Sequence, residues 1–346
     1  MVDDVPSASQ DDTAKRKSDH LRITLDADVD HVGITTGLEQ LRLNARALPG
    51  RDLGQVDLAT TVFGHRLAAP VLISCMTGGT SKAGQVNRAL AAAAAHHGIA
   101  LGLGSGRVLL QDGDPTSFAV RDIAPDILLL ANLGAVQLPQ VGTKGCRELI
   151  RRTKADGLVL HLNAVQEAVQ PGGDTAFAGL STQIAEVVTA LDCPVLVKEV
   201  GFGLSLQDVV ALVDAGVAGI DVAGAGGTNW ATVEGHRDDR AGALARAFEG
   251  WGWSTVESLS SAVSHTPDDV VVIASGGLRD GVDAVKCLSL GAELVGFGRR
   301  VLAAATNGPP QAIAELEVLI EQMRIATWAV GAPGITALNH SHVRQA

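Results

Sequence analysis

The sequence predicts an α/β fold, a (β/α)8 TIM barrel with an N-terminal extension and a long rim insertion after the sixth strand. Eight short apolar segments each end at a cluster of Gly, Ser, Asn or charged residues, and helix-favouring segments lie between them. Short β-rich segments bounded by Gly and Pro, alternating with helices, are typical of parallel βα units. The same alternation also fits an open, doubly wound sheet, which is the alternative topology.

The predicted strands are runs of small and β-branched apolar residues, the composition of strands that are buried on both faces. In chain order they span residues 69–74, 99–104, 127–131, 158–160, 194–197, 218–223, 270–274 and 294–298. Barrel enzymes carry their catalytic groups on the loops that follow the strands. We therefore expect the polar clusters after these eight segments to share one rim.

The predicted helices have the periodic apolar pattern of helices packed on one face. They span residues 87–97, 146–154, 181–191, 205–215, 255–264, 281–290 and 310–329. A polar stretch between Trp230 and Trp253 is too long for a simple βα turn and is interpreted as a lid or rim excursion. Residues 1–14, rich in Asp and Ser, are predicted to be a disordered tail, and residues 15–346 a single barrel domain.

Composition excludes several classes of protein. A net charge of −11 argues against a nucleic-acid surface, and the apolar runs are too short to cross a membrane. The four cysteines have no zinc or redox spacing and follow no signal peptide, so a cytoplasmic location is predicted. Cys75 adjoins a rim loop, but a packing role is favoured over a nucleophilic one.

Two glycine-rich loops follow the seventh and eighth predicted strands, at residues 275–279 and 296–299. In barrels of this type that corner commonly binds a phosphate, because glycine N–H groups can approach its oxygens closely. Arg279 could add charge-assisted hydrogen bonds. The alternative is that these glycines only form tight turns.

Lys198 ends the fifth predicted strand, where a buried ammonium group requires negative charge nearby. Glu199 could supply that charge as a structural ion pair. Alternatively, Lys198 faces the anionic pyrimidine edge of a reduced flavin, an arrangement that agrees with a phosphate site two or three strands away.

The fourth predicted strand leads into the most specific polar string of the chain, which contains His161, Asn163, Gln166 and Glu167. Strand alternation predicts that His161 and Asn163 point inward together, with Gln166 and Glu167 in the following loop. A glutamine cannot act as an ordinary base but can orient a substrate or a proton in transit. Glu167 is a hard oxygen ligand suited to Mg²⁺ together with substrate phosphates; taken alone, it would be a surface carboxylate.

With these motifs in order, the chain resembles the type 2 isopentenyl-diphosphate isomerases, flavin-dependent enzymes of (β/α)8 fold, over roughly residues 16–331. The motifs that carry the resemblance are Arg16-Lys17 with Asp19-His20, Thr36-Gly37-Leu38-Glu39 with Arg42-Leu43, Met76-Thr77-Gly78-Gly79, Gly104-Ser105-Gly106-Arg107, Asn132-Leu133-Gly134, His161-Leu162-Asn163, Gln166-Glu167, Lys198-Glu199-Val200-Gly201, Asp221-Val222-Ala223-Gly224, Gly226-Gly227-Thr228 with Trp230, and Ser275-Gly276-Gly277. Each motif is weak alone, but their joint order is specific.

The resemblance also implies roles for individual residues. FMN would be held by Met76, Thr77, Gly78, Ser105, Asn132, Lys198, Thr228, Gly277, Leu278, Arg279, Gly298 and Arg299. The substrate and its diphosphate would be surrounded by Arg16, Lys17, Ser105, Arg107, His161, Asn163 and Gln166, with His161, Asn163 and Gln166 as the catalytic group and Glu167 on Mg²⁺. Ala223 stands where some members have Ser, which puts one flavin hydrogen bond in doubt. Gly106 stands where Gln is frequent.

The implied reaction interconverts isopentenyl and dimethylallyl diphosphate, with reduced FMN as proton carrier, Mg²⁺ and basic side chains holding the diphosphate, and NADPH as reductant. A homotetramer or larger assembly is also implied. The main alternative is an FMN-dependent 2-hydroxy-acid oxidoreductase, which shares the strand-five lysine and the phosphate corner; His161 does not match the position of its base. A flavin-binding protein without catalysis is a third reading, and it leaves Gln166, Glu167 and the N-terminal cations without a role.

Overall fold

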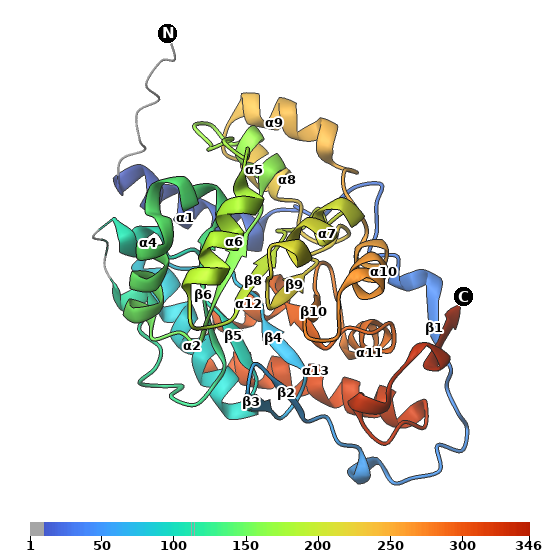
Figure 1. Cartoon of the computed structure of the whole chain (residues 1–346). Helices are drawn as coiled ribbons and strands as arrows, with labels where there is room; N and C mark the ends of the chain where they lie inside the picture. The colour runs from blue at the N-terminus through green and yellow to red at the C-terminus, as the bar shows by residue number, and fades with distance from the viewer. Residues whose placement is uncertain (1–9, 112, 114) are drawn as a thin grey trace.

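The computed structural model describes residues 10–111, 113 and 115–346. Eight parallel strands form a closed barrel in which neighbours along the chain are also neighbours in space (Figure 1). They are β4 (Val71–Ile73), β5 (Ala100–Gly102), β6 (Leu129–Gly134), β7 (Gly157–His161), β8 (Val195–Lys198), β9 (Gly219–Asp221), β10 (Val271–Ala274) and β11 (Leu294–Phe297). The barrel closes where β11 pairs with β4, at Val295 opposite Val71. The barrel prediction is therefore confirmed, and the open-sheet alternative is wrong.

Helices alternate with the strands. The seven predicted helices correspond to α2 (Ser81–His97), α4 (Leu138–Thr153), α6 (Leu180–Ala190), α7 (Leu206–Asp214), α10 (Thr255–His265), α11 (Gly281–Ser289) and α13 (Pro309–Ala329). Further helices are α1 (Gln10–Asp26), α3 (Arg107–Leu110), α5 (Ala164–Val169), α8 (Trp230–Gly235), α9 (Asp239–Ala245) and α12 (Arg299–Ala305). Short 3-10 helices are η1 (Leu38–Gln40), η2 (Leu53–Gln55), η3 (Pro115–Phe118), η4 (Ala135–Gln137), η5 (Arg246–Phe248), η6 (Ile335–Ala337) and η7 (His340–His342). Within the described residues, no helix combines the length and the apolar composition needed to cross a bilayer.

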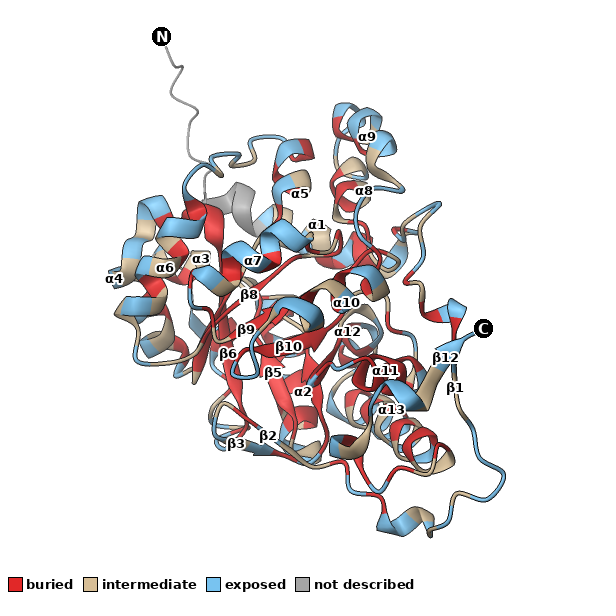
Figure 2. Ribbon diagram, turned by 45° about the vertical axis from the view of Figure 1, so that its right-hand side comes forward, coloured by how far each residue is buried: buried red, intermediate tan, exposed pale blue. Residues whose placement is uncertain are grey.

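The core consists of two layers on either side of the strands, which Figure 2 shows as buried. One apolar cluster fills the barrel and includes Leu72, Leu130 and Leu196; a larger cluster lies between the strands and the outer helices. The hairpin of β2 (Thr60–Val62) and β3 (His65–Leu67) adds Val62 and Leu67 to the interior cluster. This hairpin closes the amino-terminal end of the barrel, which leaves the opposite end for the site.

Two additions surround the open end. Helix α1 and the insertion formed by α8, α9 and η5 lie above the carboxyl ends of the strands in Figure 1. Helix α1 begins at Gln10, five residues before the predicted boundary at Lys15, because the run QDDTAKRK contains good helix formers. Residues 1–9 of the predicted tail lie outside the described residues. Elsewhere, β1 (Leu41–Leu43) pairs with β12 (Val343–Gln345) and joins the N-terminal extension to the C-terminus.

Candidate active site

A cavity of about 500 Å³ opens at the carboxyl ends of the strands. This volume is within the roughly 300–1,000 Å³ of pockets that bind small molecules and cofactors. Of the residues assigned to FMN, those that line it are Met76, Thr77, Gly78, Ser105, Lys198, Thr228, Gly277, Leu278, Arg279, Gly298 and Arg299. Asn132 lines the neighbouring, smaller cavity instead. Loops from β4, β5, β8, β9, β10 and β11 thus meet around one space.

The main chain of the loop after β10 packs closely against the main chain of the loop after β9. Gly276 and Gly277 have φ of 100° and 71°, and a Cβ on Gly276 would lie 2.1 Å from the carbonyl oxygen of Gly224. Only glycine fits such a conformation at such a distance. The loops after β9 and β10 therefore form a compact wall whose backbone faces the cavity.

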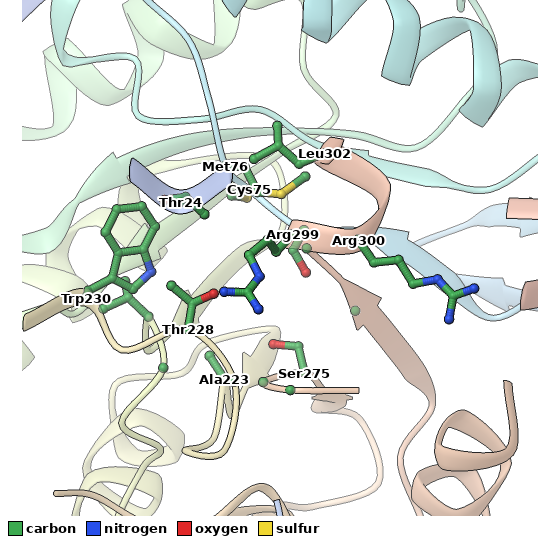
Figure 3. A pocket seen from close by; sticks show the side chains of 18 of the residues that line it. Thr24, Cys75, Met76, Ala223, Thr228, Trp230, Ser275, Arg299, Arg300 and Leu302 are labelled. Atoms are coloured by element: carbon green, nitrogen blue, oxygen red, sulfur yellow. The ribbon is translucent and has the colours of Figure 1, made fainter. Parts of the chain in front are cut away.

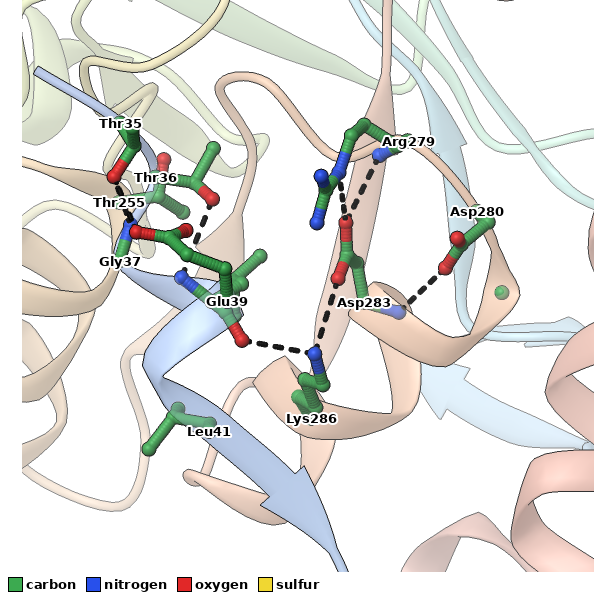
Figure 4. A network of polar contacts seen from close by, with 12 residues as sticks. Thr35, Thr36, Gly37, Glu39, Leu41, Thr255, Arg279, Asp280, Asp283 and Lys286 are labelled. Atoms are coloured by element: carbon green, nitrogen blue, oxygen red, sulfur yellow. Dashed lines mark hydrogen bonds and ion pairs between the residues drawn. The ribbon is translucent and has the colours of Figure 1, made fainter. Parts of the chain in front are cut away.

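The two arginines predicted for a phosphate are both paired with carboxylates. Arg299 points toward Thr228 in Figure 3 and donates from Nη2 to Asp30 Oδ2 at 2.9 Å, whereas Arg300 points away. Arg279 is largely exposed and donates from Nε to Asp283 Oδ2 at 3.0 Å, a pairing drawn in Figure 4. A phosphate at this corner would compete with Asp30 for Arg299.

A second cavity of about 150 Å³ adjoins the first. All residues assigned to the substrate and the metal line it, namely Arg16, Lys17, Ser105, Arg107, His161, Asn163, Gln166 and Glu167. The side chains that the two cavities share are Lys17, His20, Cys75, Met76, Ser105, Lys198, Val200 and Trp230. The structure thus places the two residue sets around two connected spaces.

Lys198 is buried at the floor between the cavities, and its Nζ donates to the carbonyl oxygen of Glu199. The Glu199 carboxylate does not form the ion pair considered above. Its Oε2 accepts from the amides of Val200, Gly201 and Phe202, and burial raises its pKa to about 7.

Asp221 stands beside Lys198 in the register of β8 and β9. Its carboxylate accepts from the Ser275 hydroxyl at 2.6 Å. Burial raises the pKa of Asp221, while the charge of Lys198 and the Ser275 hydrogen bond oppose the rise. Lys198 therefore has carboxylates in its surroundings but no salt bridge within the described part of the chain.

His161 ends β7 next to Lys198, and its Nδ1 lies 3.0 Å from Asn132 Oδ1. Burial, together with the charges of Lys198 and Lys17, lowers its pKa to about 3. The ring is therefore neutral at physiological pH, so that Nδ1 donates to Asn132 and Nε2 is left as an acceptor.

The prediction that Gln166 and Glu167 lie in a loop is wrong, since both are in the first turn of helix α5. Asn163 immediately precedes the helix and donates from Nδ2 to Glu167 Oε1 at 3.0 Å and Gln166 Oε1 at 3.2 Å. Both side chains are buried rather than turned to solvent, and Asn163 Oδ1 is buried without a partner. A helix of six residues is too short for a periodic apolar pattern, which is why the sequence analysis assigned these residues to a loop.

Glu234, in the rim insertion, is a residue that sequence reasoning missed. It is fully buried, and its Oε1 contacts His20 Nε2 at 2.7 Å and accepts from Gln166 Nε2 at 2.9 Å, while Oε2 accepts from Arg237 Nη1 at 2.6 Å. Burial alone would raise its pKa, but these partners hold it at about 2. The insertion is thus in part a fixed wall of the site. A glutamate four residues after Trp230 offers no local signal of burial.

Helix α1 supplies cations to the small cavity. Lys17 Nζ donates to the Ser105 carbonyl oxygen at 2.9 Å and lies 5.8 Å from the ring centre of Phe118. Burial, together with the charges of the neighbouring Arg16 and Arg107, lowers its pKa to about 7. Three basic groups with few counter-charges form a site that favours a polyanion.

The residues fit a flavin and a single magnesium ion. Ser74 and Thr24 line the large cavity, and their hydroxyl oxygens are buried without partners, which ligand groups could supply. Among the described residues, no cluster of three or more His, Cys, Asp or Glu could hold a metal alone. A metal at Glu167 would therefore need substrate oxygens as further ligands, a combination typical of Mg²⁺.

Comparisons with known proteins identify the family of the chain. A family model described as FMN-dependent dehydrogenase matches residues 17–109 and 142–345. Relatives named isopentenyl-diphosphate delta-isomerase include those of Synechococcus sp. (45% identical, 98% of each chain covered), Synechocystis sp. (46%, 95% of each) and Rickettsia canadensis (42%, 97% of this chain and 99% of the relative).

Solved structures show the same fold at low identity. A mandelate oxidase variant with an FMN adduct has a TM-score of 0.67 at 20% identity, covering 98% of this chain and 99% of the other. A flavocytochrome b2 variant with pyruvate bound has a TM-score of 0.71 at 16% identity, covering 94% and 82%. These likenesses establish the barrel, whereas the full-length relatives establish the family: the chain belongs to the type 2, FMN-dependent isopentenyl-diphosphate delta-isomerases.

Proposed function

We propose that this chain interconverts isopentenyl and dimethylallyl diphosphate by adding a proton to the terminal alkene carbon and removing one from C2, using reduced FMN and Mg²⁺. The observation that carries the proposal is the pair of connected cavities, one of cofactor size and one lined by cations. Reduced FMN, when bound in the large cavity, would supply a proton carrier beside the alkene.

The flavin would be held by backbone and small side chains of the large cavity. Gly277, Leu278, Gly298 and Arg299 would surround its phosphate, and Lys198 would face an anionic edge of the ring. The remaining FMN contacts would come from Met76, Thr77, Gly78, Ser105, Asn132, Thr228 and Arg279. Ala223 lines this cavity and has no side-chain donor, which fits the loss of one hydrogen bond relative to a serine.

The diphosphate would lie in the small cavity between Arg16, Lys17 and Arg107. Glu167 would bind Mg²⁺ together with phosphate oxygens. Fixing the nonreacting end of the substrate in this way orients the alkene toward the large cavity. Cations and a metal around the diphosphate, without a proton donor at the bridging oxygen, also discourage ionisation of the allylic product.

Gln166, His161 and Asn163 would form the catalytic group. Gln166 Nε2 is fixed on Glu234, so its amide presents a defined orientation to a substrate or to a proton in transit. His161 is neutral, held by Asn132, and would offer an uncharged acceptor. Asn163 fixes Gln166 and Glu167 together, which couples the alkene-binding and metal-binding parts of the site.

The 2-hydroxy-acid alternative has less support. The mandelate oxidase and flavocytochrome b2 structures are 20% and 16% identical to this chain, which shows only the fold, whereas relatives at 42–46% identity carry the isomerase name. A hydroxy-acid oxidase also needs a base beside the hydride-donating carbon, and burial among cations leaves His161 a weak base.

The decisive experiment incubates the protein with FMN, dithionite, Mg²⁺ and isopentenyl diphosphate and identifies the product. Formation of dimethylallyl diphosphate without stoichiometric consumption of reductant supports the isomerase. Oxidation of a 2-hydroxy acid with reduction of the flavin would support the oxidoreductase alternative. A protein that binds flavin but turns over neither substrate would support a binding role. Anaerobic bleaching of the flavin by NADPH tests the proposed reductant, and sedimentation tests the proposed homotetramer.

Two variants test the roles on α5. Gln166→Ala should lower turnover while the flavin stays bound, and normal turnover would remove Gln166 from the mechanism. Glu167→Gln should raise the Mg²⁺ concentration needed for half-maximal activity, and an unchanged Mg²⁺ titration would remove the metal assignment.

A further inference from the structure

Gln170 is a buried side chain of the small cavity that neither the sequence motifs nor the proposed mechanism uses. It follows α5 directly, one helical turn after Gln166, and is 6% exposed. A buried amide must satisfy both its oxygen and its nitrogen, so its two neighbours define its orientation.

Those neighbours carry opposite charges. With the amide nitrogen toward Glu234, Gln170 donates to Oε1 at 3.1 Å and its oxygen accepts from Arg16 Nη1 at 2.9 Å. The reverse orientation provides one hydrogen bond, to Glu167 Oε2 at 3.3 Å, and sets the amide nitrogen against the Arg16 guanidinium and the oxygen against the Glu234 carboxylate. The first orientation therefore has the lower energy, because both contacts are attractive and charge-assisted.

The consequence concerns the charge of Arg16. Burial lowers its pKa and Arg107 and Arg237 repel it, while Glu167 and Glu234 attract it from a distance. Within the described residues Arg16 forms no salt bridge. A direct ion pair with either carboxylate would compensate the charge of the guanidinium. A diphosphate would then have to displace that carboxylate first. A neutral amide oxygen holds the guanidinium in place and leaves its charge available.

We propose that Gln170 is a positioning residue for the diphosphate: its amide lies between Arg16 and Glu234 and holds the Arg16 guanidinium unneutralised in the small cavity. The inference rests on the proposed function, since it names the group that prepares the site for a polyanion. It also connects α1, which carries Arg16, to α5 and α8 through one side chain.

The test compares Gln170→Met, which keeps the length and removes both hydrogen bonds, with Gln170→Glu, which keeps an acceptor for Arg16 but introduces a charge. Gln207→Met, on the exposed side of α7, is the matched control. Binding of inorganic pyrophosphate with Mg²⁺ to the FMN-loaded protein is measured by calorimetry. Flavin content, the thermal unfolding midpoint, KM and kcat are measured on the same preparations.

We expect Gln170→Met to weaken pyrophosphate binding and raise KM by about tenfold, the loss of one hydrogen bond to a charged group, with flavin content and kcat changed much less. Gln170→Glu should bind still more weakly at neutral pH, because its carboxylate pairs with Arg16 and cancels the charge that the diphosphate would meet. Gln207→Met should behave as the wild type.

Wild-type pyrophosphate affinity in both variants, or an equal loss of flavin, kcat and thermal stability, would overturn the inference and assign Gln170 a purely structural role. Should Gln170→Met fail to fold, the pyrophosphate affinity of Gln170→Glu decides, and wild-type affinity in that variant counts against the proposal. Isomerase activity of the wild type in these preparations tests the proposed function separately. An active wild type with unaffected Gln170 variants rejects the positioning role alone.

Discussion

The two connected cavities are built from different parts of the chain. The large one is rich in glycine, from the loops after β9, β10 and β11, and has arginines that are already paired at its edge. The small one is formed by side chains of α1, α5 and α8, which bring cations and carboxylates into one buried network. The first should therefore be sensitive to added volume, and the second to changes of charge.

The difference has a physical origin. A rigid planar cofactor with a phosphate can be held by many backbone contacts whose geometry is fixed once the loops have folded. A diphosphate with a metal carries several charges that must be balanced in a site partly shielded from water, which requires charged side chains at defined positions.

The largest effect is expected from volume added to the glycine wall. A Cβ on Gly276 would lie 2.1 Å from Gly224 O and 2.4 Å from Gly224 N, so Gly276→Ala must displace the loop after β9. FMN binding should be lost, as measured by flavin absorbance after gel filtration. The control is Gly64→Ala, in the β2–β3 turn, where φ is 78° but no atom lies within 4 Å of the added carbon. Retention of FMN by Gly276→Ala would contradict a wall built on close backbone contact.

A charge change directly behind the small cavity should have the next largest effect. Glu234→Ala leaves Arg237 and Gln166 without their buried acceptor, and removing one partner of a buried pair costs about 3–5 kcal/mol. Urea unfolding should show this loss, and turnover should fall because Gln166 is no longer oriented. Glu148→Ala removes the exposed pair with Arg151 and should cost less than about 1 kcal/mol. Similar losses of unfolding free energy in the two variants would mean that Glu234 stabilises the fold no more than an exposed carboxylate does.

The same division explains how much the sequence could predict. The barrel strands were recognisable because local composition determines them, as in β8, where Val195–Lys198 overlaps the predicted 194–197. The glycine loops were recognisable because a positive φ and close approach demand a specific residue. Glu234 and Gln170 were missed because their roles depend on α1, α5 and α8 meeting in space, and nothing in their immediate sequence distinguishes them from surface residues.

Lys17 makes the small cavity dependent on pH. Burial lowers its pKa to about 7, so the free enzyme loses this charge as the pH rises above that value. A bound diphosphate favours the charged form, so binding takes up a proton, and affinity should fall by up to about tenfold per pH unit on the alkaline side. Pyrophosphate titrations above neutral pH measure this slope, with Lys17→Arg as the reference for changes in the ligand's own ionisation. Lys17→Arg stays charged, so a slope that persisted in that variant would exclude Lys17 as its origin.

The smallest expected effect concerns Arg299, a predicted phosphate contact of the large cavity that is already paired with a carboxylate. Asp30 Oδ2 accepts from Arg299 Nη2 at 2.9 Å, and both side chains are partly exposed, so their pairing is worth at most about 1 kcal/mol. Asp30→Asn should release Arg299 and tighten FMN binding by up to about fivefold, as followed by flavin fluorescence during titration of the apoprotein. Asp28→Asn, two residues away and exposed, should leave the affinity unchanged. Weaker FMN binding in Asp30→Asn would show instead that the carboxylate orients Arg299 toward the phosphate. The large cavity would then, like the small one, depend on a network of charged side chains.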